Sequence, residues 1–315
     1  AFFKALLFLA AGSVIIAMHH DQDIRNMGGI RRYMPITWIT SLIGSLARIG
    51  FPGFAGFYSK DAIIEAVHAS TRWGSGVAYW AVLLGVIVTS FYSFRLLYLT
   101  FHGKPRYTID VGAGHHPPDG VLQHEPKESP LVVTVPLILL AIPSIVIGYM
   151  TIEPVLFGGW LSDSITVLPQ NDALATVGEH FHGPTAMALH GVQTAPFWLM
   201  LGGFVLATFI YMVRPATADK LQQRFPKLHA LLENKFYIDE LYQKLFIART
   251  VDIGNGLWKK ADAGFIDGWL VNGSAKLMGN LAARIRVLQS GYLFHYAFAM
   301  IIGLIGILAI WVTLK

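Results

Sequence analysis

Long runs of apolar residues alternate with shorter polar segments along the chain. A helix needs about 20 apolar residues to cross a bilayer core of about 30 Å. Six runs have about this length or more, at residues 1–18, 34–69, 77–101, 131–151, 195–213 and 291–314. The pattern predicts an all-α protein built as a polytopic bundle of transmembrane helices.

The second apolar run contains a signal for a break in the helix. It is too long for one straight span at about 1.5 Å per residue, and Gly50-Phe51-Pro52-Gly53 lies in its interior. Proline lacks an amide hydrogen and clashes with the preceding turn, and glycine weakens a helix. We therefore predict an interrupted helix over 34–69.

Basic residues are placed unevenly between the apolar runs. They follow the first run and lie around the segment between the third and fourth, at Arg25, Arg31, Arg32, Arg95, Lys104, Arg106 and Lys127. Residues 152–193 contain no Lys or Arg, and Arg72 is the one basic residue in the other loop of that side. Because cytoplasmic loops are enriched in Lys and Arg, we predict alternating spans with 152–193 external.

Residues 214–290 differ from the apolar runs. They carry twelve Lys or Arg and seven Asp or Glu, with apolar groups at helical spacing such as Leu241, Leu245 and Trp269. This pattern is typical of an amphipathic helix on a membrane face. Two interpretations stay open: one long lateral helix, on the order of 100 Å, or several short helices. Pro226 and the five glycines within 254–273 weaken a continuous helix.

Composition agrees with a membrane protein. Of the 315 residues, 54% are hydrophobic and 14% are charged, and the mean hydropathy is +0.51. The net charge is +5, and the basic residues are grouped in the segments predicted to be cytoplasmic. We therefore attribute the positive charge to membrane topology and predict no nucleic-acid partner. The absence of cysteine excludes disulfides, thiolate metal sites and cysteine nucleophiles.

These patterns divide the chain into five parts. We expect residue 1 to lie inside a helix, so that 1–151 is the fragment of a transmembrane bundle. An external loop follows at 152–194 and a transmembrane helix at 195–213. The lateral region covers 214–290, and 291–315 is a transmembrane anchor.

Three Lys or Arg residues, Lys4, Arg48 and Lys60, lie inside the first two apolar runs. A charge at the bilayer centre costs at least about 2.5–3.5 kcal/mol, so each needs a partner, water or an interfacial position. Lys4 could reach an interface with its long side chain. Arg48 is interpreted as a structural anchor to carbonyls freed by the helix break.

Lys60 is the strongest candidate for chemistry. It follows the break and precedes Asp61, and transporters use interrupted helices for ion sites. A desolvated lysine near a carboxylate can exchange a proton near neutral pH. The alternative is a static Lys60–Asp61 ion pair, although adjacent helical residues do not face each other.

Other chemistries lack a motif. Histidines cluster in predicted loops, at His19, His20, His115, His116, His124, His180 and His182, but no paired helical histidines with a carboxylate occur. We predict no metal site. Phosphate-binding, dinucleotide-binding and nucleophile-elbow motifs are absent, so no redox or hydrolytic centre is expected in this chain.

The motifs of residues 1–105 resemble a known family. FFKALLFLAAGSVIIAMHHDQDIRNMGGIRRYMP, FPGFAGFYSKDAII, FYSFRL and FHGK occur in this order. They are similar to the second half of the L-type antiporter-like subunits of respiratory complex I, the proton-pumping NADH:quinone oxidoreductase. After residue 105 the resemblance rests on architecture alone: a penultimate span, a lateral helix and a last anchoring span.

The resemblance implies a function for the buried lysines. Lys4 and Lys60 would belong to a polar axis that passes protons, with Asp61 beside its last lysine, driven by quinone reduction in distant subunits. Flavin, iron–sulfur clusters and quinone would lie in partner subunits and no cofactor in this chain. The expected partners are membrane lipids and other membrane-arm subunits, especially antiporter-like neighbours along the lateral helix. The expected location is a bacterial inner membrane.

Three alternatives remain open at this point. An Mrp-type sodium/proton antiporter subunit shares the F-F-K and S-K-D motifs. A membrane subunit of an energy-converting hydrogenase is also related to this pattern. A purely structural scaffold would fit the lateral helix and the missing redox centre.

Overall fold

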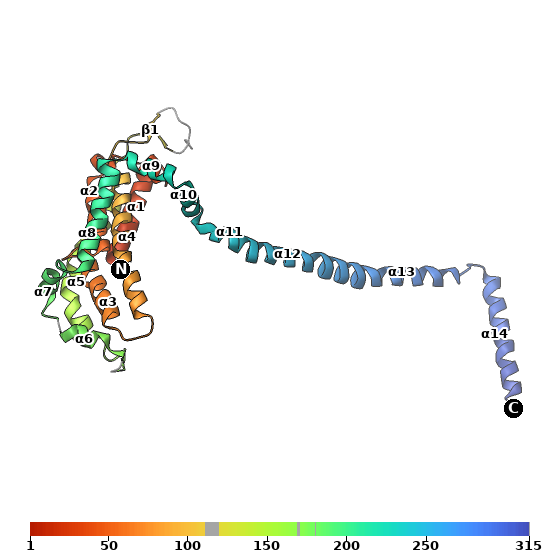
Figure 1. Ribbon diagram of the computed structural model, residues 1–315. Coiled ribbons are helices and arrows are strands. Elements are labelled where there is room, and N and C mark those ends of the chain that lie inside the picture. Colours follow the sequence, from red (N-terminus) through yellow and green to blue (C-terminus); the bar gives the residue numbers. More distant parts are fainter. Residues whose placement is uncertain (111–119, 169–170, 180, 315) are drawn as a thin grey trace. The chain divides into compact units, whose positions relative to one another are not determined.

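The computed structural model describes residues 1–110, 120–168, 171–179 and 181–314. Two compact units are present, Ala1–Arg224 and Phe225–Lys315, and each is described by itself. The first unit is a helix bundle (Figure 1). Its main helices are α1 Phe2–Ala17, α2 Pro35–Ile49, α3 Ala55–Ala69, α4 Ser75–Phe101, α5 Leu131–Ile152 and α8 Ala195–Thr208.

Four helices in the described part of the chain are long and apolar enough to cross a membrane. They are Ser75–Phe101, Leu131–Phe157, Ala195–Val213 and Leu293–Thr313. The predicted spans from 77, 131, 195 and 291 correspond to them. The first apolar run forms the shorter apolar helix α1, and the second forms two helices, α2 and α3. The predicted transmembrane, all-α class is confirmed.

The predicted helix break lies between α2 and α3. Gly50 ends α2 with a left-handed φ of 80°, and Gly53 has a φ of 89°. Residues with a Cβ rarely adopt this conformation. The two glycines on either side of Phe51-Pro52 therefore permit the turn between the helices. The Phe51 amide donates to the carbonyl of Leu46 at 3.1 Å, which closes the end of α2. The interrupted helix is confirmed.

Shorter elements lie at the ends of the bundle. Ile24–Asn26 and Ile30–Arg32 form 3-10 turns before α2, and β1 Thr108–Ile109 pairs in parallel with β2 Val121–Leu122. Between α5 and α8 the chain forms a π-helical turn, Glu153–Phe157, then α6 Ala173–Glu179 and α7 Pro184–Gly191. After α8 come a second π-helical turn, Phe209–Val213, and α9 Ala216–Arg224.

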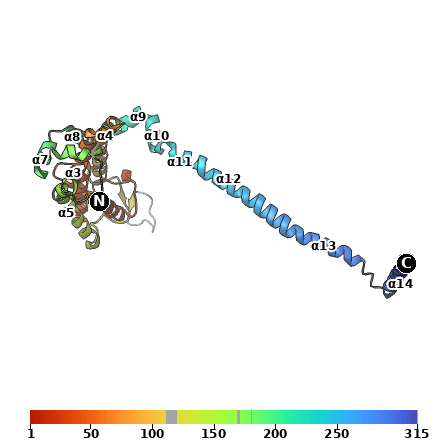
Figure 2. The ribbon, with the colours of Figure 1, turned by 90° about the horizontal axis from the view of Figure 1, so that it is seen from below.

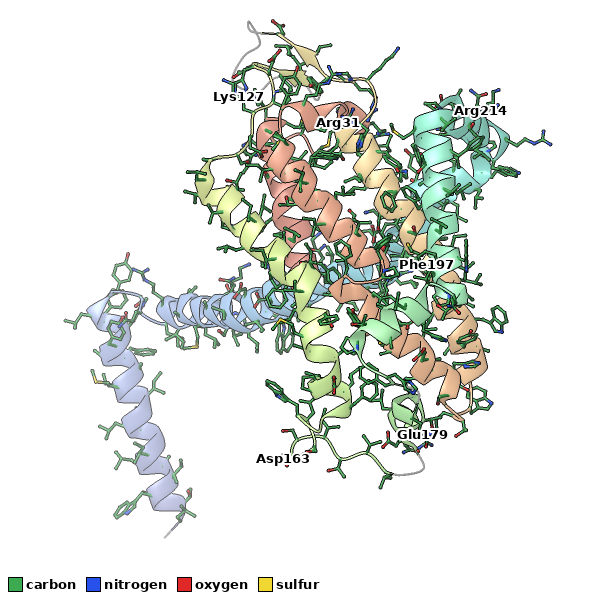
Figure 3. All side chains as sticks on the ribbon, turned by 90° about the vertical axis from the view of Figure 1, so that its left-hand side faces the viewer. Arg31, Lys127, Asp163, Glu179, Phe197 and Arg214 are labelled. Atoms are coloured by element: carbon green, nitrogen blue, oxygen red, sulfur yellow. The ribbon has the colours of Figure 1, made fainter. Side chains whose placement is uncertain are left out.

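Charged loops separate to opposite ends of the bundle. Arg31, Lys127 and Arg214 lie at one end, and Asp163 and Glu179 lie at the other (Figure 3). This grouping follows the predicted alternation, because the segments predicted to be cytoplasmic share one end. The side of the membrane that each end faces stays a prediction.

Close packing holds the bundle helices together. α4 packs along α8, where the Ser90 hydroxyl donates to the carbonyl of Met200 at 2.7 Å. A Cβ on Gly203 would come within 2.5 Å of the carbonyl oxygen of Ile87, so glycine permits this approach. A buried hydrophobic cluster joins α1, α2, α4 and α8, and a smaller one joins α1 to α5 through Leu6 and Leu137.

The second unit contains the predicted lateral region from residue 225 onward. α10 Pro226–Glu233 ends before three residues with left-handed φ, Lys235–Tyr237. Helical turns then run without interruption through α11 Ile238–Tyr242, α12 Ala248–Gly256 and α13 Asn272–Val287 (Figure 2). π-Helical stretches, Gln243–Ile247 and Leu257–Val271, join them. α14 Leu293–Thr313 follows.

The outcome for the lateral region lies between the two interpretations. Residues 238–287 form one helix, on the order of 70 Å long at about 1.5 Å per residue, whereas 216–233 form two short helices. The glycines within 254–273 do not end the long helix, since the backbone passes through them in the helical region. Pro226 begins a helix, where its missing amide hydrogen costs nothing.

Candidate functional site

A cavity of about 640 Å³ lies beside the helix break. Three basic residues line it, each from a different helix: Lys4 on α1, Arg48 on α2 and Lys60 on α3. Most of its wall is apolar, and hydroxyl groups interrupt this wall at Ser41, Ser45, Thr89, Tyr92, Ser93 and Thr100. The structure therefore brings the two predicted relay lysines to one cavity.

A second cavity, of about 20 Å³, is also lined by Lys60. Gly50 and Pro52 of the break line it, together with Asp61 and residues from the end of α7 to the first turns of α8, among them Phe197. Phe197 lies between the two charged ends of the bundle (Figure 3). This volume is about that of one water molecule. Among the described residues, Lys60 is the one that lines both cavities.

The Lys60 ammonium is shielded and has no ion-pair partner in the described part of the chain. Its Nζ atom is buried and has no hydrogen-bond partner among the residues that the structure describes. The aliphatic stem passes Gly50, where an added Cβ would stand 3.2 Å from Lys60 Cδ. A buried ammonium without a protein partner is costly as a cation unless solvent or another group compensates it. This setting suits a group that gains and loses its proton.

Asp61 is more deeply buried than its neighbour. The residue is 5% exposed, and its Oδ2 atom has no hydrogen-bond partner in the described part of the chain. Among the described residues no Lys60–Asp61 ion pair is found, whereas Arg25–Asp23 and Lys235–Asp239 do form ion pairs. The static-pair alternative thus finds no contact to support it, in agreement with the different directions of adjacent helical side chains.

The remaining basic residues of the cavity differ in role. Lys4 is exposed, so it lies at the open side of the cavity. Arg48 Nη2 donates to the Tyr92 hydroxyl at 2.9 Å, and the guanidinium lies 4.7 Å from the ring centre. The anchor of Arg48 is therefore Tyr92 on α4 rather than carbonyls of the break. The Ser59 hydroxyl donates to the Gly56 carbonyl within its own helix.

Two histidines meet at the basic end of the bundle. The Nε2 atoms of His19 and His124 are 3.1 Å apart, and burial lowers the pKa of His19, with further lowering from His124 and His20. No group of three or more metal-ligating side chains occurs among the described residues. His115, His116 and His180 lie outside the described residues.

Sequence reasoning missed a carboxylate that holds the start of α2. Glu128 accepts from the amides of Ile36 and Thr37, at 2.7 and 3.3 Å, and from the Thr37 hydroxyl at 2.6 Å. A carboxylate at a helix N-terminus satisfies free amides and opposes the helix dipole. The pairing spans more than 90 positions of the sequence, so no local pattern signals it.

Comparison with known proteins identifies the family. Residues 1–91 match the transmembrane family described as NADH:quinone oxidoreductase/Mrp antiporter. NADH-quinone oxidoreductase subunit L of Neisseria meningitidis is 48% identical over 98% of this chain and 47% of its own length. The chain belongs to the NADH:quinone oxidoreductase/Mrp antiporter family.

More distant relatives cover the same share of the chain. Subunit L of Rhodobacter capsulatus is 35% identical over 99% of this chain and 50% of its own length. NADH-ubiquinone oxidoreductase chain 5 of Arabidopsis thaliana is 36% identical over 96% of this chain and 44% of its own length. The chain therefore spans about half the length of the relatives it matches.

Proposed function

We propose that this chain is part of a proton-translocating membrane subunit of an NADH:quinone oxidoreductase, and that Lys60 relays protons between the two cavities. The single observation that carries the relay is the position of Lys60, which lines both cavities with a buried ammonium that has no hydrogen-bond partner among the described residues. Similarity to relatives named as NADH-quinone oxidoreductase subunit L supports the assignment to this enzyme.

The relay follows from the chemistry of the cavity lining. Lys4 and the hydroxyl groups of the large cavity supply polar positions along which water can carry a proton toward Lys60. The proton adds to the neutral amine of Lys60 and leaves it through the small cavity, where Asp61 receives it. Lysine can occupy both protonation states when it is desolvated, whereas arginine stays protonated.

The wider setting is part of the same proposal. Electrons would pass through flavin, iron–sulfur clusters and quinone in partner subunits, and this chain would hold no cofactor. Its neighbours would be other membrane-arm subunits in a bacterial inner membrane, reached along the helix of residues 238–287. The exposed apolar side chains of Leu241, Leu245 and Trp269 support such a contact surface.

The test replaces Lys60 in the complete subunit, within its membrane complex. Lys60→Ala should lower proton pumping and coupled quinone reductase activity by about tenfold or more, while the complex still assembles. Lys60→Arg should rescue pumping poorly, because its charge is permanent. Lys127→Ala removes an exposed lysine and is the matched control. Normal pumping in Lys60→Ala, or full rescue by arginine, would refute the relay.

An Mrp-type antiporter is the second candidate, because the family description names both groups. The measured ion separates the two. An NADH-driven proton gradient that is independent of sodium supports the oxidoreductase, whereas sodium movement that is independent of NADH supports the antiporter.

A further inference from the structure

α3 carries two more titratable side chains beyond Asp61. Glu65 follows Asp61 by four residues and His68 follows Glu65 by three. Residues at these spacings share one face of a helix, with Cβ atoms about 5–6 Å apart. Asp61, Glu65 and His68 therefore form a column along α3, which we name the α3 column.

The inner end of the α3 column opens on the small cavity. Asp61 lines this cavity, is 5% exposed, and keeps an unpartnered Oδ2 atom among the described residues. Glu65 is half-buried and lies one helical turn after Asp61 on the same face of α3. When two carboxyl groups are one helical turn apart, a second negative charge is less favourable than the first. This favours a proton shared between Asp61 and Glu65.

The outer end of the α3 column reaches the surface. His68 is exposed, and its ring lies 4.8 Å from the ring of Tyr79 at the start of α4. α3 begins at the helix break in the middle of the bundle and packs against α6, which ends at Glu179. Figure 3 places Glu179 and Asp163 at the end opposite the basic loops. The column thus leads from the buried site toward the end that holds Asp163 and Glu179, where Arg72 is the one basic residue of the loop after α3.

We propose that Asp61, Glu65 and His68 form the release path by which a proton leaves Lys60 for the external side. This inference rests on the proposed relay function of Lys60. The proton leaves the Lys60 ammonium and forms an O–H bond on Asp61. The proton then passes from Asp61 to a Glu65 oxygen. From Glu65 it passes to a ring nitrogen of His68, and from His68 to bulk water, so that each donor returns to its starting state.

The path also explains why Asp61 can act without an ion pair to Lys60. A carboxylate fixed to Lys60 by a salt bridge would hold the proton back, whereas an unpaired one can accept it and pass it outward. Residues 152–193 carry four Asp or Glu and no Lys or Arg, so this end stays negative overall despite Arg72 in the loop after α3, and it favours departure of a cation from the column.

The experiment compares Glu65→Gln with Glu153→Gln in the complete subunit, assembled in its complex and reconstituted in vesicles. Glutamine keeps the shape of glutamate but cannot carry the proton. Glu153 is an exposed glutamate at the end of α5, outside the α3 column, and serves as the matched control. Glu65→Gln should lower the initial rate of proton pumping by about tenfold, and Glu65→Asp should restore most of it. Glu153→Gln should pump normally.

Separate outcomes distinguish the two proposals. If Glu65→Gln assembles and pumps like Glu153→Gln while Lys60→Ala is impaired, the release path is wrong and the relay at Lys60 stands. If Lys60→Ala also pumps normally, both proposals fail. If Glu65→Asp fails to rescue an impaired Glu65→Gln complex, a carboxylate relay at this position is wrong as well. Complex yield is measured for every variant, so that loss of pumping is read only from assembled protein.

Discussion

Gly56, in the first turn of α3, lies directly against the carbonyl oxygen of Ala47, in the last turn of α2. A Cβ on Gly56 would overlap this oxygen and also approach the Ala47 carbonyl carbon at 2.8 Å. The Ala47 carbonyl is part of the backbone, and a Cβ at position 56 would be bonded directly to the backbone. Neither group can therefore rotate away from the other. This contact folds the two half-helices against each other and sets the position of Lys60, one turn further along α3.

Gly56→Ala should therefore loosen the interrupted helix. Overpacking of this kind costs about 1–3 kcal/mol, more than alanine gains over glycine in a helix. We expect a lower midpoint of thermal unfolding in detergent and weaker proton pumping. Gly85→Ala is the matched control, because a Cβ at Gly85 meets nothing within 4 Å. Equal midpoints for the two variants would mean that the contact with Ala47 is not tight.

Much of this region could be predicted from the sequence because its determinants are local. Proline and glycine at residues 50–53 define the break, and Lys60 and Asp61 follow it directly. The continuity of the helix after residue 238 could not be predicted from the sequence, because glycine weakens a helix without always ending it. Left-handed backbone at Lys235–Tyr237 marks the actual boundary, and no glycine or proline there signals it.

The partners of the site residues could not be predicted, because they lie far away in the sequence. Arg48 meets Tyr92, 44 positions later, and Glu128 meets Ile36 across 92 positions. Such pairs depend on how helices pack, which periodicity does not encode. Glu65 follows Asp61 by four residues, but no sequence pattern shows that Asp61 lines the small cavity.

Glu128 should stabilise the bundle through the start of α2. Glu128→Ala would leave the amides of Ile36 and Thr37 without their acceptor, at a cost of about 1–3 kcal/mol. The midpoint of thermal unfolding should fall, while Glu125→Ala, which removes an exposed carboxylate three positions earlier, should leave it nearly unchanged. A fall of equal size in both variants would point to general charge effects instead of capping.

The His19–His124 pair should make stability depend on pH. Burial and the neighbouring histidines lower the pKa of His19 from 6.5. The unfolded chain then binds more protons than the folded chain below this pH, so the free energy of unfolding is highest above about pH 6.5 and falls as the pH drops. Unfolding midpoints between about pH 7.5 and 5.5 should fall less steeply in His124→Gln, and His190→Gln should keep the original slope. An unchanged slope in His124→Gln would contradict this coupling.

Topology can be tested by labelling, because the chain contains no cysteine. Ser162 lies in the segment without Lys or Arg, and Ser274 lies in α13 with an exposed side chain. Ser162→Cys should react with an impermeant thiol reagent from the external side, and Ser274→Cys from the cytoplasmic side. Reaction of both from one side would overturn the predicted alternation of spans.

The long helix of residues 238–287 should matter for assembly more than for membrane insertion. Leu245 lies in its π-helical stretch, Gln243–Ile247, and its side chain is 53% exposed in the isolated chain. Proline here would remove an amide hydrogen and clash with the preceding turn, at a cost of about 3 kcal/mol. The break would turn the rest of the helix away from any partner that it contacts along its length. Leu245→Pro should therefore insert into the membrane normally, yet co-purify with partner subunits in a reduced amount. Leu245→Ala keeps the helix while it trims the side chain, so its loss should be smaller and should measure the contact of that side chain alone. Co-purification of the proline variant at the wild-type level would show that an unbroken helix is not needed to hold the partners.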